Sequence, residues 1–266
     1  MKGRTKLVSL VTILGILLTV SLVFASGFVD VSTVSLFSEP PILPDADGTE
    51  VFVDPGKIIV DYIYDSSYQI GNTFVVHINV SDVTDLFSYQ VNVTWNTDVL
   101  NFTGISEYGE FLARTGSTYG TSRIQDIYVA SNETGYACIA ETILGNYAGI
   151  SGNGRLVTIE FEIVGYGYSN IGLSELGPLG VFLLDSSGTE MPFTTVDGYF
   201  RNALLGDATL DGVVDVFDVL KVKYHRSGPP PGPGGYIREV DINDDGSIDV
   251  FDILIVKANL GRGPVP

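Results

Sequence analysis

Two acidic segments near the carboxyl end of the chain contain the residues best suited to bind a metal ion. They read DATLDGVVDVFD (residues 207–218) and DINDDGSIDVFD (residues 241–252), with oxygen-bearing side chains at positions one, three, five, nine and twelve and glycine at position six. A loop with this spacing wraps around one hard cation, with a main-chain carbonyl from position seven and a bidentate carboxylate from position twelve. The glycine permits the sharp turn, and the cation offsets the repulsion between crowded carboxylates. We therefore expect two calcium sites.

Two other interpretations of these segments are weaker. A pair of acidic, solvated turns would not be expected to repeat the ligand spacing, the glycine and the closing Asp-Val-Phe-Asp together. Magnesium binds fewer protein ligands and keeps several of its waters. Calcium remains the expected ion.

An apolar stretch follows each loop and predicts a short helix. Apolar residues and one lysine recur at helical spacing in both stretches. They are Val216, Val219, Leu220 and Lys223 after the first loop, and Val250, Ile253, Leu254 and Lys257 after the second. No helix-length apolar segment precedes either loop, so each unit is a loop followed by a helix. Because so small a module has a thin core, metal binding should supply much of its folding free energy.

The middle of the chain, residues 56–201, predicts β-structure. Stretches rich in Val, Ile, Thr, Tyr and Phe alternate with polar residues, and Gly, Asn, Asp and Ser cluster between them. The expected strands are Thr73–Val80, Phe87–Trp95, Ile124–Ala130, Tyr136–Ile143, Arg155–Val164 and Val196–Arg201. Short strands at such intervals indicate a two-sheet sandwich or jelly roll. The expected fold class is mainly β, with a sandwich followed by a small α-helical calcium-binding module at residues 203–266.

The beginning of the chain predicts an export segment. Three basic residues precede an uncharged apolar run over residues 7–25, and small residues follow it. This pattern is typical of a secretory signal peptide over residues 1–25, and the run is also long enough for an N-terminal membrane anchor. Residues 26–55 contain four prolines and little periodicity, so we interpret them as a linker.

The overall composition limits the partners and the chemistry. The chain of 266 residues carries 14 Lys and Arg against 32 Asp and Glu, for a net charge of −18. This charge disfavours nucleic acid and anionic membrane surfaces, so a membrane would be reached only through an uncleaved anchor. A single cysteine excludes an internal disulfide.

Four Asn-x-Ser/Thr sequons fit a secreted or cell-surface protein, because such sites accept glycans on exported surfaces. The acceptor residues are Asn79, Asn92, Asn101 and Asn132.

Residues 206–260 resemble a type I dockerin through the repeated Gly-Asp-x-x-x-Asp-Gly-x-x-Asp-x-x-Asp pattern and the helix that follows it. The resemblance implies two F-hand loops that bind calcium and helices that dock onto a cohesin. The implied ligands are Asp207, Thr209, Asp211, the Val213 carbonyl, Asp215 and Asp218, then Asp241, Asn243, Asp245, the Ser247 carbonyl, Asp249 and Asp252. Thr209 departs from the usual Asn or Asp, so we expect the first site to bind calcium less tightly.

The dockerin resemblance also implies a partner-binding surface on the two helices. Its residues would be Val216, Phe217, Lys223, Val250, Phe251 and Lys257. The apolar pairs differ from the small hydroxyl residues of clostridial examples. Phe217 and Phe251 fit the module's own core equally well. Two nearly duplicate helices would permit two docking orientations related by a half-turn.

The middle of the chain resembles a cohesin. Residues 86–100 (LFSYQVNVTWNTDVL) and 150–161 (ISGNGRLVTIEF) are similar to two strands of that family. The resemblance implies a jelly-roll β-sandwich over residues 56–201.

These features favour a non-catalytic extracellular scaffold or adaptor over an enzyme. It would join cohesin- or dockerin-bearing proteins, or copies of itself, in calcium-dependent, cellulosome-type assemblies linked to polysaccharide binding or degradation.

A second interpretation is a carbohydrate-binding sandwich carried on a dockerin, which requires a row of exposed aromatics. Candidates are Tyr62, Tyr64, Tyr68, Tyr119, Tyr128 and Tyr147. A third is a small glycoside hydrolase, which requires two suitably spaced carboxyls. Candidates are Glu107, Glu110, Glu141, Glu160 and Glu162, and no spacing singles out a pair.

Overall fold

The computed structural model describes residues 48–113, 120–129, 134–173, 180–227 and 231–263. Its strands are β1 (Glu50–Asp54), β2 (Lys57–Val60), β3 (Thr73–Asn96), β4 (Leu100–Tyr108), β5 (Thr121–Val129), β6 (Thr134–Ile143), β7 (Ile150–Ile163), β8 (Gly167–Leu173), β9 (Phe182–Asp185), β10 (Thr194–Val196) and β11 (Gly198–Asn202). Its helices are α2 (Val216–His225) and α3 (Val250–Ala258), with 3₁₀ turns at Ser66–Tyr68 and Arg238–Val240. Within these ranges, no helix is long and apolar enough to cross a bilayer.

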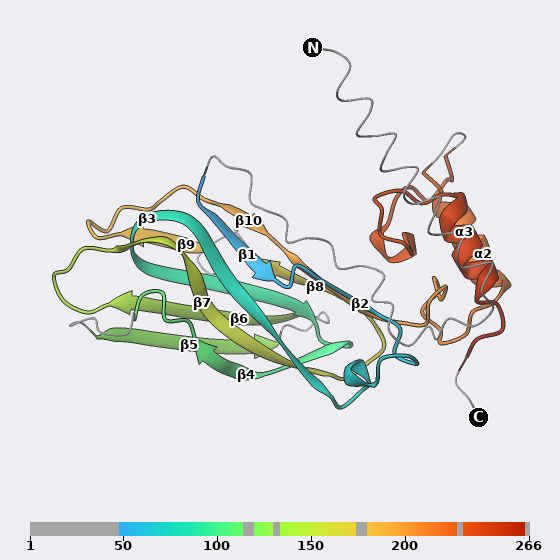
Figure 1. Ribbon diagram of the computed structural model, residues 1–266, viewed down its shortest axis with the longest axis horizontal. Helices are drawn as coiled ribbons and strands as arrows, with labels where there is room; N and C mark the ends of the chain where they lie inside the picture. Colours follow the sequence, from blue (N-terminus) through green and yellow to red (C-terminus); the bar gives the residue numbers. More distant parts are fainter. Residues whose placement is uncertain (1–47, 114–119, 130–133, 174–179, 228–230, 264–266) are drawn as a thin grey trace, which may run out of the picture. The chain divides into compact units, whose positions relative to one another are not determined.

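The long strand β3 organises the sandwich. Its first half pairs with β1 and β7, and its second half pairs with β6, β8 and β9. The register shifts at three places between Ile78 and Leu86, and Asp82 and Asp85 adopt positive φ angles of 51° and 64°. Such irregularities bend a strand without ending it. Figure 1 shows β3 turning at one end of the sandwich and running back, so one strand serves both layers.

The other strands extend these two layers. The hydrogen-bonded order is β10-β1-β3-β8-β11-β2, with β4 added to β7 and β5 added to β6. The pairs β1–β10 and β2–β11 are parallel, and the other pairs are antiparallel. Buried and half-buried residues alternate strictly along β6, as expected where one face of a sheet covers a core. The two layers of the sandwich therefore enclose a core to which alternate residues of a strand contribute.

Aromatic side chains fill the centre of the sandwich. Phe74 stacks on Phe200 with ring centroids 4.7 Å apart, and Trp95 lies 5.4 Å from Phe161 in an edge-to-face arrangement. Trp95 is only 3% exposed. Rings of this size dominate the energetics of a core, so these residues anchor the fold.

The structure confirms the mainly β fold class and has a strand at each expected stretch, with several differences. The expected strand Val196–Arg201 is divided at Asp197 between β10 and β11, and the sequence does not predict β2, β4, β8 and β9. Thr73–Val80 and Phe87–Trp95 belong to one bent strand, because the residues between them form bulges. Residues 50–54, which the sequence places in the linker, instead form strand β1 and bury Val51 and Val53. That strand is too short for its alternation to stand out beside Pro55. The expected signal peptide and most of the linker lie outside the described residues.

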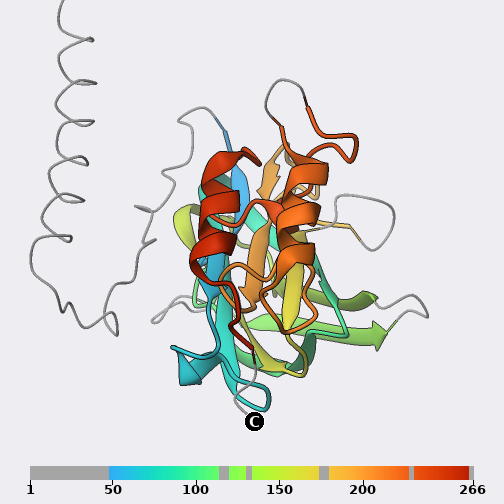
Figure 2. The ribbon, with the colours of Figure 1, turned by 90° about the vertical axis from the view of Figure 1, so that its right-hand side faces the viewer.

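The helical module has its own small core. Leu204, Val214, Val222, Ile248 and Val256 are all fully buried in it. Figure 2 shows α2 in orange and α3 in red next to each other. Each helix follows one acidic loop, as the sequence predicts.

Candidate calcium-binding loops and helix surface

The two acidic loops adopt the same tight turn. Gly212 and Gly246, at position six, have φ angles of +85° and +86°. Leu210 and Asp244, at position four, also have positive φ angles of 63° and 52°. This backbone region is costly for residues other than glycine. Both loops are therefore held in a specific closed conformation.

The carboxylate at position one folds each loop around itself. Asp207 accepts hydrogen bonds from the backbone N–H groups of Leu210, at 2.7 Å, and Gly212, at 2.9 Å. Asp241 accepts the corresponding bond from Gly246 at 2.8 Å. Asp207 and Asp241 are almost completely buried. The loop backbone thus wraps around a buried carboxylate in both repeats.

The carboxylates at positions nine and twelve begin the helices. Asp215 accepts from the N–H of Phe217, and Asp218 accepts from the N–H of Asp215, both at 2.7 Å. Asp249 and Asp252 form the same capping box at the start of α3. Capping stabilises a helix start by about 1 kcal/mol. The last carboxylate of each loop is therefore also part of the first turn of each helix.

Position three differs between the two loops. The Thr209 hydroxyl donates to Asp218 Oδ1 at 2.8 Å and lies 3.3 Å from Asp207 Oδ1, so positions one, three and twelve meet. In the second loop, Asn243 Nδ2 donates to Asp245 at 2.8 Å, while Asn243 Oδ1 is buried with no hydrogen-bond partner. A buried acceptor without a partner costs about 1–3 kcal/mol. A cation bound in the loop would satisfy this oxygen.

The oxygen atoms that the two loops offer fit calcium, because they include carboxylate, hydroxyl, amide and main-chain carbonyl oxygens. Among the described residues, no three His, Cys, Asp or Glu side chains gather closely enough to form a metal cluster. Calcium also accepts amide, carbonyl and water oxygens in flexible geometry. Asp211 and Asp245, at position five, are exposed and accept from the backbone N–H two residues on. Their remaining lone pairs are available to an ion.

Burial and mutual repulsion make these loops costly without a cation. Burial raises the pKa of Asp207, Asp241 and Asp252 above the ordinary range, and neighbouring carboxylates add to the effect. Backbone N–H groups oppose the shift in each case. A divalent ion would favour the charged forms.

The first turn of each helix presents an exposed apolar pair. Val216 and Phe217 are 58% and 62% exposed, and Val250 and Phe251 are 55% and 59% exposed. The alternative in which the phenylalanines belong to the core is therefore wrong. Val219 turns inward, so the expected apolar face of α2 is split between core and surface.

Further along both helices, the exposed residues include Leu220, Leu254, Lys223 and Lys257. The six residues expected to bind a partner thus all lie at the surface.

The sequons in the sandwich differ in exposure. Asn101 is exposed and donates to Glu162, and Asn79 is half-buried. Asn92 is only 2% exposed within β3, so the expectation that it is a glycan acceptor does not fit the folded chain. Asn132 lies outside the described residues.

The aromatic row expected of a carbohydrate-binding module is not formed by the described tyrosines. Tyr64 and Tyr147 are exposed, Tyr68 is half-buried and Tyr62 is buried. Tyr119 and the side chain of Tyr128 lie outside the described part.

The carboxylates nominated for hydrolysis are engaged elsewhere. Glu141 is buried, with Arg123 Nε at 2.8 Å and the Tyr89 hydroxyl at 3.2 Å. Glu107 pairs with Arg155, Glu160 accepts from Thr103, and Glu162 accepts from Asn101. Glu110 lines a separate, open depression with Asp54 and His77. These contacts fit structural roles.

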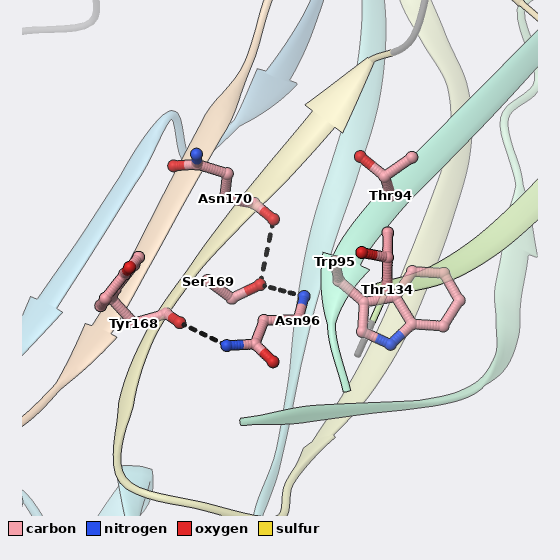
Figure 3. Close-up of a pocket in the computed structure, with 7 residues that line it drawn as sticks. All are labelled: Thr94, Trp95, Asn96, Thr134, Tyr168, Ser169 and Asn170. Atoms are coloured by element: carbon pink, nitrogen blue, oxygen red, sulfur yellow. Dashed lines mark hydrogen bonds between the residues drawn. The ribbon is translucent and has the colours of Figure 1, made fainter. Parts of the chain in front are cut away.

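A shallow pocket of about 320 Å³ opens on the sandwich (Figure 3). It is lined by Thr94, Trp95, Asn96, Thr134, Tyr168, Ser169 and Asn170. Ser169 accepts from the N–H of Asn96 at 2.9 Å, and Asn96 donates to the Tyr168 carbonyl at 3.4 Å. The lining carries no acid, base or cation, and Trp95 is packed into the core rather than offered to a ligand.

Comparison with known families identifies the two modules. Residues 62–175 match the cohesin domain, and residues 205–261 match the dockerin type I domain. The chain therefore contains a cohesin domain with a β-sandwich fold, followed by a type I dockerin domain. Both are non-catalytic assembly modules that are typically extracellular or on the cell surface, and type I dockerins generally bind calcium.

Solved structures give distant similarities. A non-cellulosomal cohesin from Archaeoglobus fulgidus is 16% identical with a TM-score of 0.41, covering 59% of this chain and 91% of that one. A type II cohesin domain from Acetivibrio cellulolyticus is 14% identical with a TM-score of 0.43, covering 58% and 94%. A type I cohesin–dockerin complex from Clostridium thermocellum is 15% identical with a TM-score of 0.42, covering 59% and 99%. A search of curated proteins found no match.

Proposed function

We propose that this chain is a non-catalytic extracellular adaptor whose dockerin binds a cohesin on another protein when two calcium ions fill its loops. Its own cohesin domain would receive a dockerin from a further partner or from another copy of the chain. The assembly would act in polysaccharide binding or degradation at the cell surface or in the medium.

One observation carries the proposal. The last two carboxylates of each loop cap the helix that follows, and the exposed Val-Phe pair lies between those two carboxylates in the chain. Whatever fixes the carboxylates at positions nine and twelve therefore also fixes the apolar pair. Calcium at those carboxylates would set the surface that a partner recognises.

The buried Asn243 oxygen supports calcium in the second loop, and the Thr209 hydroxyl between Asp207 and Asp218 supports a cation position in the first. The proposed ligands are the residues assigned from the dockerin resemblance. Neutralising the buried carboxylates would stabilise the loops, which bring together groups of like charge.

Calcium calorimetry on the full chain tests the ligand assignment. We expect two ions per chain, and we expect Asp218→Ala and Asp252→Ala each to remove one of them, because each deletes the bidentate carboxylate at position twelve. Glu190→Ala, an exposed carboxylate of the sandwich, is the matched control and should still bind two ions. Unchanged calcium stoichiometry in both loop variants would refute the assignment.

A further inference from the structure

The dockerin core is completed by a residue from the sandwich. Tyr62, which follows β2, is 8% exposed and packs in the same apolar cluster as Leu204, Val219 and Ile242. Its ring stacks on Tyr166 with centroids 3.8 Å apart. A core that borrows a large side chain is incomplete without the module that supplies it.

One sandwich carboxylate ties both ends of the dockerin. Asp61 Oδ2 accepts from the Leu205 N–H at 3.0 Å and from Arg262 Nη2 at 2.7 Å. The Arg262 side chain is 19% exposed and the Asp61 side chain 13%. Arg262 also donates to Asn259 at 2.8 Å, just after α3. Partly buried ion pairs with such additional hydrogen bonds are geometrically specific.

Both calcium loops are held from the sandwich side. Arg201, which is 4% exposed in β11, donates to the Asp207 carbonyl at 3.2 Å in the first loop. Lys57 in β2 pairs with Asp244 in the second loop at 2.5 Å. Asp244 has the positive φ angle of position four, so this contact fixes a strained point of the turn.

The 3₁₀ turn before the second loop adds two more contacts to the sandwich. The Arg238 guanidinium lies 3.9 Å from the centroid of the Tyr199 ring, and Glu239 hydrogen bonds to the Tyr168 side chain. A guanidinium this close to the face of a tyrosine ring is attracted to it, and more strongly where water is excluded. The contacts thus reach both ends, both loops and the core of the dockerin, while the Val-Phe pairs stay exposed.

From these contacts we propose that the sandwich has a docking surface for the chain's own dockerin, formed by Lys57, Asp61, Tyr62, Tyr168, Tyr199 and Arg201. The two modules then unfold together and keep one orientation. The dockerin's apolar helix surface remains free for a different molecule. Calcium binding in the loops stabilises the sandwich through the same surface, a consequence that rests on the proposed function.

The chain contains separate reporters for its two modules. Trp95, the single tryptophan, is buried in the sandwich, and α2 and α3 both belong to the dockerin. Urea unfolding of the full chain should therefore be followed by tryptophan fluorescence and by circular dichroism at a helix wavelength, in calcium and in chelator. We expect the two transitions to coincide in calcium, as in a single cooperative unit, and chelation to lower the fluorescence midpoint.

Variants on the surface test the proposal. Tyr62→Ala and Arg262→Ala should separate the two transitions, with the helical signal lost at lower urea and most of the calcium effect on Trp95 removed. Tyr147→Ala, an exposed tyrosine outside these contacts, should leave the transitions coincident. If Tyr62→Ala does not fold, Arg262→Ala and Lys57→Met still give the test.

Two results would overturn this proposal. One is that the wild-type transitions are already separate, and the other is that they stay coincident in every surface variant. Calorimetry that shows two bound calcium ions together with separate transitions would leave the proposed function standing and remove only the docking surface. Coincident transitions in a chain that binds no calcium would leave the docking surface standing and remove the proposed calcium-dependent function.

Discussion

At the residue scale, position three distinguishes the two loops. The Thr209 hydroxyl donates its hydrogen to Asp218, whereas Asn243 presents a buried amide oxygen with no hydrogen-bond partner. A calcium ion accepts oxygen lone pairs, so a buried acceptor that has no other partner is the better ligand. The second loop is therefore the better prepared of the two.

Replacing Thr209 with asparagine should strengthen the first site. Thr209→Asn supplies the amide oxygen of the second loop, and we expect calcium to bind about fivefold more tightly at that site, equivalent to about 1 kcal/mol. Calcium calorimetry in an Asp252→Ala background isolates the first loop. Thr209→Val, which removes the oxygen, is the control and should bind more weakly. A tighter site in Thr209→Val would contradict the assignment of position three.

Acidification should act oppositely on the metal-free and the calcium-bound dockerin. The pKa values of Asp207, Asp241 and Asp252 are raised in the folded state, so their charged forms lower the free energy of unfolding. This loss of stability is absent at low pH and grows as the pH rises through those pKa values. In chelator, the loops should thus contribute less to stability at pH 7 than at a pH close to the ordinary pKa of an aspartate carboxyl. In calcium the trend reverses, because protons compete with the ion. Melting followed by circular dichroism at both pH values checks the reversal, and parallel trends with and without calcium would count against it.

At the element scale, each helix starts on the carboxylates of its loop. Asp215 and Asp218 cap α2, Asp249 and Asp252 cap α3, and the apolar pair lies within the same first turn. A helix of two or three turns has little intrinsic stability. Its position is therefore set by its cap, by the core and by any ion at that cap.

Truncating the exposed phenylalanines should weaken partner binding without unfolding the helices. For Phe217→Ala combined with Phe251→Ala, we expect a loss of about 2 kcal/mol or more, roughly 30-fold, in affinity for a cohesin-bearing partner. Calcium stoichiometry and the helical signal should be unchanged, because both rings are exposed. Ile70→Ala, which truncates an apolar residue of the sandwich that is 50% exposed, is the control. Equal losses in both variants would remove the helix surface from the interface.

The sequence predicts the parts of this structure that depend on local spacing. Residues 207–218 and 241–252 repeat a ligand pattern, and β6 and β7 alternate over enough residues to be recognised. The five residues of β1 show too little alternation to predict a strand, and the bend at Asp82 and Asp85 resembles a turn, so the sequence divides β3 into two predicted strands.

Side-chain environments that depend on distant contacts could not be predicted. The burial of Asn92 and the position of Tyr62 in the dockerin core both depend on residues far away in the chain. The exposure of Phe217 was also open, because a helix with apolar residues on both sides does not show which side faces the core.

At the scale of the whole molecule, the chain combines a receiving module and a docking module. The cohesin domain and the dockerin domain both assemble proteins, and the dockerin's apolar helix surface is exposed in this chain. Its own sandwich contacts the dockerin through other residues. The proposed role is therefore a link between molecules, with copies of the chain or other cohesin- and dockerin-bearing proteins on either side.

Calcium-dependent capture by the full chain tests the central claim most directly. The immobilised wild-type chain, exposed to the extracellular proteins of its source and separately to a second copy of itself, should retain cohesin-bearing chains in calcium. It should release them when calcium is chelated, and the Asp218→Ala, Asp252→Ala double variant should retain none of them. Retention of the same cohesin-bearing proteins in chelator and by that variant would contradict the account.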